Sequence, residues 1–394
     1  MTITYLDNNA TTRVDPAVLE EMLPFFCQTY GNPSSAHGPG NQAARALAQA
    51  RERVASALGC HPDEIVFTAG GSESDNAAIR SALRSRPDKR HLLTTRVEHP
   101  AVLNLARELE SQGYAITRLG VDADGRLDLD EYRDSLRPDT ALVSVMYANN
   151  ETGVLFPVYE LASIARERGI LFHTDAVQAV GKVGCNLLRL PADFLALSGH
   201  KLHAPKGVGA LFVRRGVPLH PLIVGGGQEH GRRAGTENMA GIVGLGKAME
   251  LAACAMTDEA ARLAALRDRL ETTLLASIPD ACRNGAAEPR LPNTASLAFR
   301  HVDGAAVLRQ LDQLGICASA GAACAAGGLK VSSVLAAMGL PLDQARGTIR
   351  FSLGRFSTAD DVDIVLRELP PMVARLRRDQ PGCGLPGAAG CTGN

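Results

Sequence analysis

The sequence predicts an α/β protein in which helices cover a mostly parallel sheet. Between residues 60 and 215, apolar strand-like segments alternate with helical segments, and each predicted strand ends in polar residues. Alternation at this spacing requires crossover connections, which produce parallel strands with helices on both faces. Ligands of such sheets bind at the carboxyl ends of the strands. A functional site is therefore expected where these strands end.

The individual elements follow from local patterns. Strands are expected at 64–70, 91–99, 140–150, 170–178, 193–201 and 209–215, and helices at 72–83, 100–113 and 158–169. Residues 246–275 have apolar residues at helical spacing and predict one long helix or two shorter ones.

After residue 275 the pattern changes to that of a smaller α/β unit. Strands are expected at 291–300, 316–321 and 348–355, and helices at 303–315 and 358–378. The boundary between the two units is expected near residues 250–260, inside the helical stretch.

Composition limits the classes of function. The chain has 394 residues, 45% hydrophobic and 21% charged, with a net charge of −1. This length allows two domains, and the charge gives no electrostatic case for nucleic acid or a membrane surface. No apolar run approaches the ~20 residues that span a bilayer. The N-terminus lacks the basic and apolar regions of a signal peptide, so the expected location is the cytoplasm.

The nine cysteines show no C-x-x-C pair, which favours free thiols in a reducing compartment. One of them, Cys324, stands in the run "ASAGAACAAGGLK", which has no hydrophobic periodicity. From this run alone, Cys324 is either a residue without a chemical role or a reactive group. The glycine- and proline-rich residues 379–394 predict a loose tail.

Two strand ends carry weak signals of a binding site. Gly71 and Ser72, in "FTAGGSESDN", start a helix after a strand, where backbone N–H groups bind phosphate well. An ordinary strand-to-helix turn capped by Ser72 explains the same letters. His173 and Asp175 alternate along another strand and share a face. They predict a metal pair, an anion at the bottom of a cofactor site, or a buried, hydrogen-bonded carboxylate.

The most informative segment is "LSGHKLHAPKGVGAL". Lys201 follows an apolar strand in a loop rich in glycine and histidine, whereas most lysines occupy polar helical faces. A partly desolvated lysine has a lowered pKa and forms Schiff bases. Pyridoxal phosphate requires such a lysine, an acidic partner for its ring nitrogen and a phosphate cradle. Lys201, Asp175 and the Gly71–Ser72 turn together predict this cofactor.

Two further residues suit a substrate of the amino-acid class. His99, at the end of "TTRVEH", predicts an imidazole that stacks on a cofactor ring or moves protons, although a satisfied loop histidine is an equal alternative. Arg350, in "TIRFSLGR", predicts a guanidinium that binds a carboxylate through two parallel hydrogen bonds. Arg355 is the weaker candidate for this role.

Many motifs occur together and in order. They are "YLDNNATTRVDP", "YGNPSSAHGPGNQ", "SESDN", "VEHPAVL", "ANNETG", "HTDAVQAVGK", "SGHKLHAPKGVGAL", "GGGQEHGRRAGTEN" and "IRFSLGR". On these motifs the chain resembles the cysteine desulfurases, most closely the nitrogen-fixation (NifS) type, from about residue 4 to residue 377. The resemblance implies a fold type I pyridoxal-phosphate transferase, active as a homodimer, with a mostly parallel seven-stranded sheet in a large domain and a smaller α/β domain.

The resemblance also implies domain limits. Residues 13–256 form the large cofactor domain, and residues 1–12 with 257–378 form the small domain that carries the catalytic cysteine loop. Residues 379–394 form the flexible tail.

The resemblance also assigns roles. Lys201 matches the Schiff-base lysine, Asp175 the partner of the ring nitrogen, Gln178 that of the ring hydroxyl, and His99 the stacking imidazole. Phosphate ligands are implied at Gly71, Ser72, Ser198, Gly199 and His200, with Thr236 reaching the phosphate across the dimer. Asn150 and Arg350 match the substrate-facing pair.

Cys324 falls on the family's nucleophile. L-Cysteine is then converted to alanine and a persulfide on Cys324, and the sulfur passes to an iron–sulfur scaffold protein, in this type for nitrogenase clusters. The persulfide of Cys324 is also a candidate ligand of a transient iron–sulfur cluster. One departure stands out, because four positions that carry hydroxyls in the family's serine-rich loop are Ala320, Ala322, Ala325 and Ala326.

Two other functions remain open from the sequence. A different pyridoxal-phosphate enzyme of this fold, such as an aminotransferase or a selenocysteine lyase, shares Lys201 and Asp175, but an aminotransferase has no use for Cys324. A scaffold that mainly docks sulfur-handling partners needs no cofactor and would lack its yellow absorbance.

Overall fold

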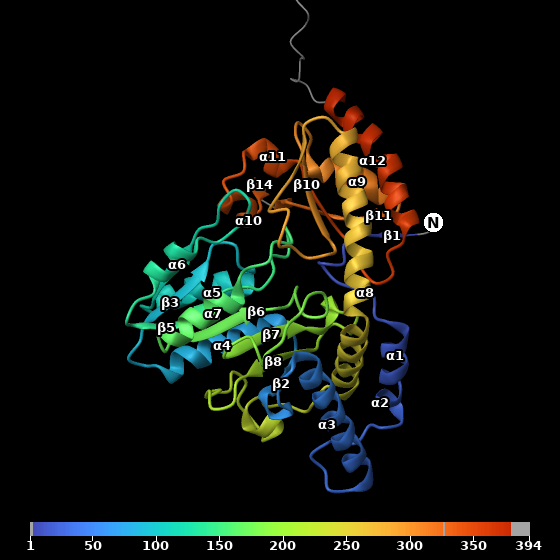
Figure 1. The fold of residues 1–394 in the computed structure, drawn as a ribbon. Coiled ribbons are helices and arrows are strands. Elements are labelled where there is room, and N and C mark those ends of the chain that lie inside the picture. Colours follow the sequence, from blue (N-terminus) through green and yellow to red (C-terminus); the bar gives the residue numbers. More distant parts are fainter. Residues whose placement is uncertain (1–2, 326–327, 380–394) are drawn as a thin grey trace, which may run out of the picture.

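The computed structural model describes residues 3–325 and 328–379 (Figure 1). A seven-stranded sheet forms its larger part, in the spatial order β2-β8-β7-β6-β5-β3-β4. The strands are β2 (Ile65–Thr68), β3 (His91–Thr95), β4 (Ala115–Leu119), β5 (Thr140–Ser144), β6 (Leu171–Asp175), β7 (Phe194–Ser198) and β8 (Gly209–Val213). Only β8 runs antiparallel to its neighbours, so the predicted mostly parallel sheet is confirmed.

Alternating side chains of each strand pack against helices on opposite faces. Leu92 of β3 and Phe194 of β7 join one core with α4 (Gly71–Ser85) and α5 (Pro100–Ser111). Their neighbours Leu93 and Leu195 join the other core. Both faces are therefore buried, which is why these strands are continuous apolar runs in the sequence.

Further helices complete the large unit. They are α1 (Pro16–Met22), α2 (Pro24–Cys27), α3 (Gly38–Leu58), α6 (Leu129–Ser135) and α7 (Val158–Glu167), with short 3-10 turns η1 (Pro62–Glu64), η2 (Gly199–Lys201) and η3 (Gln228–Gly231). Strand β4 has no counterpart among the predicted elements. It lies at the sheet edge and is mostly half-buried, so it lacks the apolar run that marks the central strands.

The smaller unit has its own sheet and core. Four antiparallel strands lie in the order β12 (Ser319–Ala320), β15 (Thr348–Ser352), β10 (Thr294–Phe299) and β9 (Ala281–Arg283). The helices are α9 (Gly304–Gln313), α10 (Ser333–Ala337), α11 (Leu342–Arg346) and α12 (Ala359–Asp379). Near the N-terminus, β1 (Thr4–Tyr5) pairs in parallel with β11 (Ile316–Cys317), and Leu6 joins the smaller core.

Residues 246–275 belong to one helix, α8 (Met239–Ser277), which runs along both units (Figure 1). Its first half places Leu245 and Met249 in the larger core, and its second half places Leu270 and Leu274 in the smaller one. The helix is long and apolar enough by composition to cross a membrane, although Lys247 and Glu250 interrupt its apolar residues. However, 61% of its apolar window is buried inside the protein, as is usual for a core helix.

The run around Cys324 contains regular structure that its composition does not predict. Backbone pairing of β13 (Ala322–Ala325) with β14 (Gly328–Val331) forms a hairpin, which we call the cysteine hairpin. The composition does not predict these strands, because backbone hydrogen bonds need no side-chain pattern. Residues 380–394 of the predicted tail lie outside the described part.

Candidate active site

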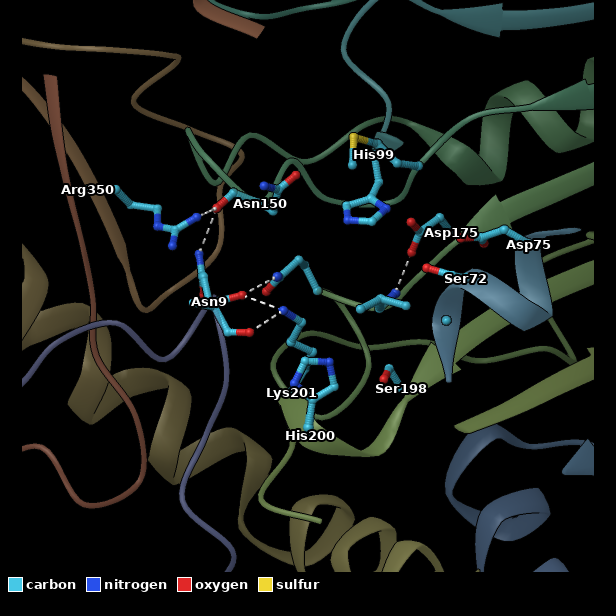
Figure 2. Close-up of a pocket in the computed structure, with 15 residues that line it drawn as sticks. Asn9, Ser72, Asp75, His99, Asn150, Asp175, Ser198, His200, Lys201 and Arg350 are labelled. Atoms are coloured by element: carbon cyan, nitrogen blue, oxygen red, sulfur yellow. Dashed lines mark hydrogen bonds between the residues drawn. The ribbon is translucent and has the colours of Figure 1, made fainter. Parts of the chain in front are cut away.

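A cavity of about 330 Å³ opens where the strands of the large sheet end (Figure 2). It is lined by Asn9, Ala10, Gly71, Ser72, Asp75, His99, Met146, Asn150, Asp175, Val177, Gln178, Ser198, His200, Lys201 and Arg350. The residues come from the ends of β6 and β7, the start of α4, the loops after β3 and β5, the N-terminal segment and β15. Most of the predicted site residues therefore face one volume, as parallel strand ends require.

Lys201 lies in the turn η2, directly after β7. Its Nζ donates hydrogen bonds to the main-chain oxygens of Asn9 and Ala10, both at 2.7 Å. Burial, together with the positive charge of Arg350, lowers the pKa of Lys201 to about 8. A substantial neutral fraction of this amine is thus available near neutral pH, and a neutral amine is what attack on a carbonyl requires.

Asp175 ends β6 and is only 6% exposed. Its Oδ1 accepts a hydrogen bond from the Val177 N–H at 2.9 Å. Burial, and next the nearby carboxylate of Asp75, raise the pKa of Asp175 to about 7. A buried carboxylate of this kind is stabilised by a cationic partner at short range. The protonated nitrogen of a pyridine ring is such a partner.

His173, two residues before Asp175, does not line the cavity. Its Nδ1 lies 2.9 Å from the Ser144 hydroxyl, and its Nε2 lies 3.4 Å from Oδ1 of Asp75. Burial lowers the pKa of His173 to about 4. The alternative of a metal pair formed by His173 and Asp175 therefore finds no support in this arrangement. The ligand atoms of Asp75, His99 and Asp175 instead lie within 4.8 Å of one another.

The start of α4 forms the end of the cavity that suits a phosphate. Its N-cap is Gly70, with φ of 153°, and among the described residues no side chain bonds the first amides of this 15-residue helix. The alternative in which Ser72 caps the turn is therefore wrong. A Cβ on Gly71 would lie 2.6 Å from Cγ2 of Val177, so only glycine fits here. Free amides at a helix N-terminus, beside Ser198 and His200, bind anions.

Arg350 lies at the opposite end of the cavity (Figure 2). Its Nη1 donates to the main-chain oxygen of Asn150 at 3.0 Å, and its Nη2 contacts Oδ1 of Asp7 at 2.7 Å. Arg355 instead contacts Asp15 at 2.8 Å and Glu259 at 3.1 Å, and it does not line this cavity. The structure therefore separates the two arginines that the sequence left as stronger and weaker candidates.

His99 is the N-cap of α5, and its Nδ1 accepts from the Ala101 N–H at 3.2 Å. Burial lowers its pKa, Asp175 opposes this effect, and Lys201 adds to it. The side-chain oxygen of Gln178 accepts from Nζ of Lys182 at 2.8 Å, and its amide nitrogen donates one N–H to the main-chain oxygen of Asn9 at 2.9 Å, so a second N–H is left to donate. A donor at this position suits an anionic oxygen on a ligand.

Three predicted site residues are not among those that line the cavity. Gly199 is buried, and its N–H bonds the oxygen of Val208 at 3.0 Å. Thr236 is exposed on a loop of the large unit. Cys324 lies in β13, opposite Leu329, and its side chain falls outside the described part, so its roles as nucleophile and as cluster ligand stay predictions.

The cavity also contains residues that the sequence did not single out, notably Asn9 and Asp75. Asn9 is part of the motif "YLDNNATTRVDP", which carried the resemblance but no assigned role. Asp75 lies one helical turn after Gly71 and therefore shares its face. Its spacing of one helical turn from Gly71, at the suspected phosphate turn, was the signal in the sequence that could have identified Asp75 as a cavity residue.

The chain matches the family model described as aminotransferase class-V over residues 4–365. It is 55% identical over 381 residues to a protein of Trichormus azollae named "Cysteine desulfurase", covering 97% of this chain and 95% of that one. It is 53% identical over 378 residues to "Cysteine desulfurase NifS" of Azotobacter vinelandii, covering 96% and 94%. A solved "NIFS-LIKE PROTEIN" superposes with a TM-score of 0.90 at 40% identity, covering 95% of this chain and all of that one (100%).

The matches extend over nearly the whole chain. The α/β fold predicted from the sequence agrees with the solved structure that superposes on this chain. The lysine, the buried carboxylate and the open helix start face the same cavity. The chain belongs to the class-V aminotransferase family and, within it, to the cysteine desulfurases.

Proposed function

We propose that this chain uses pyridoxal phosphate to remove the sulfur of L-cysteine and to load it onto Cys324. The observation that carries the proposal is the convergence of Lys201, Asp175 and the uncapped start of α4 on one cavity, with Arg350 at its far end. An amine, an anion for a ring nitrogen and a phosphate cradle are the three features that this cofactor needs.

The residues present fit the cofactor. The amides at the start of α4 with Ser72, Ser198 and His200 would hold its phosphate, Asp175 its ring nitrogen, Gln178 its ring hydroxyl and His99 one face of its ring. When bound, pyridoxal phosphate supplies an electron sink for the pair left when the Cα–H bond of the substrate breaks.

Arg350 would bind the carboxylate of L-cysteine through its guanidinium, with Asn150 beside it. The Lys201 amine, once released from the cofactor, would take the proton from the substrate Cα. Its lowered pKa supports this role, since a base that titrates near the working pH is the most effective.

The thiolate of Cys324 would then attack the sulfur of the substrate. A sulfur–sulfur bond forms as the Cβ–S bond breaks, the electron pair of the broken bond stays with Cβ, and protonation of that carbon releases L-alanine. The sulfur left as a persulfide on Cys324 would pass to an iron–sulfur scaffold protein, in a nitrogenase context. A transient iron–sulfur cluster on this persulfide belongs to the same proposal.

A cytoplasmic homodimer is the form we propose, with Thr236 of one protomer reaching the phosphate of the other. A second cavity of about 520 Å³ shares Gly71, Ser72, Ser198 and His200 with the first, so the phosphate end is open on the outer side of a single chain. Val224, on the loop before Thr236, is 83% exposed, which suits an interface between copies.

The domain limits also remain our proposal. The large domain comprises 13–256, the small domain 1–12 with 257–378, and the tail 379–394. The smaller core supports this division, because it combines Leu6 with residues from the second half of α8 onward.

The test is to measure sulfide and alanine from L-cysteine with the purified holoenzyme and with Cys324→Ala, with dithiothreitol present to reduce the persulfide to the free thiol and sulfide. We expect equal amounts of both products from the holoenzyme, and a loss of sulfide with unchanged cofactor absorbance in the variant. Unchanged sulfide release from Cys324→Ala would exclude the nucleophilic role. A purified protein without cofactor absorbance would favour the scaffold alternative.

A further inference from the structure

One carboxylate oxygen connects the substrate end of the cavity to the strand that precedes the cysteine hairpin. Oδ1 of Asp7 contacts Nη2 of Arg350 at 2.7 Å and accepts a hydrogen bond from the Ser319 hydroxyl at 2.8 Å. The side chains of Arg350 and Asp7 are 12% and 19% exposed, so water screens this contact only weakly. Ser319 lies in β12, two residues before Gly321 at the base of the hairpin.

The other end of the hairpin is held in a similar way. Ser332, directly after β14, donates from its hydroxyl to Oε2 of Glu151 and accepts from the Val334 N–H. Glu151 follows Asn150, whose main-chain oxygen accepts from Nη1 of Arg350 at 3.0 Å. Before the hairpin, Ser319 is thus bonded to Asp7, which contacts Arg350. After it, Ser332 is bonded to Glu151, the neighbour of Asn150, which also contacts Arg350.

The base of the hairpin is tightly packed, which allows a displacement to pass through it. The Gly321 N–H donates to the oxygen of Thr348 at 2.9 Å, and the Ser332 N–H donates to the oxygen of Gly321 at 2.8 Å. A Cβ on Gly321 would lie 2.6 Å from Cδ1 of Leu335. Because this base has no empty space to absorb a movement, a shift of Ser319 is passed on to the strands of the hairpin.

We propose that Asp7 is a positioning residue that couples the binding of a carboxylate at Arg350 to the base of the cysteine hairpin. The inference rests on the proposed function, because it takes Arg350 as the group that binds the substrate carboxylate. A second carboxylate at this guanidinium repels Asp7 and competes for the same positive charge. When Asp7 is displaced from Arg350, the shared oxygen moves with it, and the Ser319 hydroxyl loses its acceptor. The hairpin that carries Cys324 is thereby loosened at its base when substrate is present.

The chain contains a matched control for this pair. Arg355 and Asp15 form an ion pair at 2.8 Å, with side chains 17% and 12% exposed. This pair also joins the N-terminal segment to the small unit, but Asp15 has no bond to the strands that flank the hairpin among the described residues. Asp15→Asn therefore removes a similar charge without touching the proposed coupling.

The test uses the holoenzyme with L-alanine as a carboxylate probe that carries no sulfur. Hydrogen exchange is measured by mass spectrometry in peptides that contain Gly321 and Ser332. We expect L-alanine to raise exchange there about tenfold in the natural protein and in Asp15→Asn, and to leave it unchanged in Asp7→Asn. In turnover assays, Ser319→Ala is expected to lower kcat about threefold with KM unchanged, and Asp7→Asn with Ser319→Ala to cost no more than Asp7→Asn alone.

Three results would overturn the coupling while leaving the proposed function intact. One is an L-alanine response of Asp7→Asn equal to that of the natural protein. Another is a fully additive double variant. If L-alanine binds, as seen by the cofactor absorbance, but exchange stays constant in the natural protein, the coupling is also wrong. If L-alanine leaves the cofactor absorbance unchanged, the proposed role of Arg350 fails first, and the coupling fails with it.

Discussion

The cavity and the cysteine hairpin are built on opposite principles. Asp75 and Asp175 line the cavity with 1% and 6% exposure. Asp175 ends a strand of the seven-stranded sheet, which is covered on both faces, and Asp75 lies on the helix α4. The cysteine hairpin is a two-stranded sheet of its own, and most of its sequence is alanine and glycine. Two-stranded hairpins are marginally stable by themselves, whereas covered central strands open only with the domain. Groups that must stay in register with a cofactor thus occupy strand ends, and the reagent proposed to carry sulfur away occupies a small separate element.

The largest effect on kcat is expected from a substitution in the cavity, at Asp175. Asp175→Asn removes the charge that would stabilise a protonated ring nitrogen, so we expect kcat to fall at least about a hundredfold. Steady-state sulfide release and the cofactor absorbance band measure this. Asp193→Asn is the control, because this carboxylate bonds the Phe172 N–H at the other end of the same strands. A fall in kcat of less than threefold for Asp175→Asn would contradict its assignment.

A smaller effect, on the rate of cofactor binding, is expected when the positive charge near Lys201 is removed. The amine reacts with the cofactor only when neutral, so the rate at which the apoenzyme binds pyridoxal phosphate should rise with pH through about 8. Arg350 lowers the pKa of Lys201, so Arg350→Gln should raise this pKa and move the profile to higher pH. At pH 7 the rate would then fall about threefold.

Arg355→Gln is the control for the pH profile, because Arg355 is not among the groups that shift the pKa of Lys201. Stopped-flow absorbance of cofactor binding across pH 6 to about 10 provides the measurement. A profile that moves equally in both arginine variants would show that Arg350 has no specific influence on Lys201.

The smallest effect is expected on the hairpin side. Restoring two hydroxyls with Ala322→Ser and Ala325→Ser should leave the cofactor affinity unchanged and alter kcat by at most about twofold, the effect of one weak hydrogen bond. Cofactor titration and sulfide assays on the double variant measure both quantities. A weaker cofactor affinity would contradict the distinction between the two regions, since it would show that the hairpin influences cofactor binding in the cavity.

The central strands were predictable because each is a buried apolar run, and their ends were predictable as a site because parallel strands end at one edge. Lys201 and Asp175 were identified in this way, whereas Arg350 was identified from a strand of the smaller unit as a guanidinium suited to a carboxylate. Strand β4 was not, since an edge strand needs no apolar run. Asp75 was missed because its one signal, a spacing of one helical turn from Gly71, depends on first accepting that Gly71 begins a phosphate-binding helix.

The sequence by itself determined the covered sheet, the residue types at its strand ends and the family. Only the tertiary structure decided which arginine faces the cavity, because Arg350 and Arg355 lie five positions apart on the same segment. It also decided that Asn9 and Asp7, near the N-terminus, meet residues more than a hundred positions away. The reason is physical: periodicity reports which side of an element is buried, whereas a contact between distant segments depends on how whole units pack together.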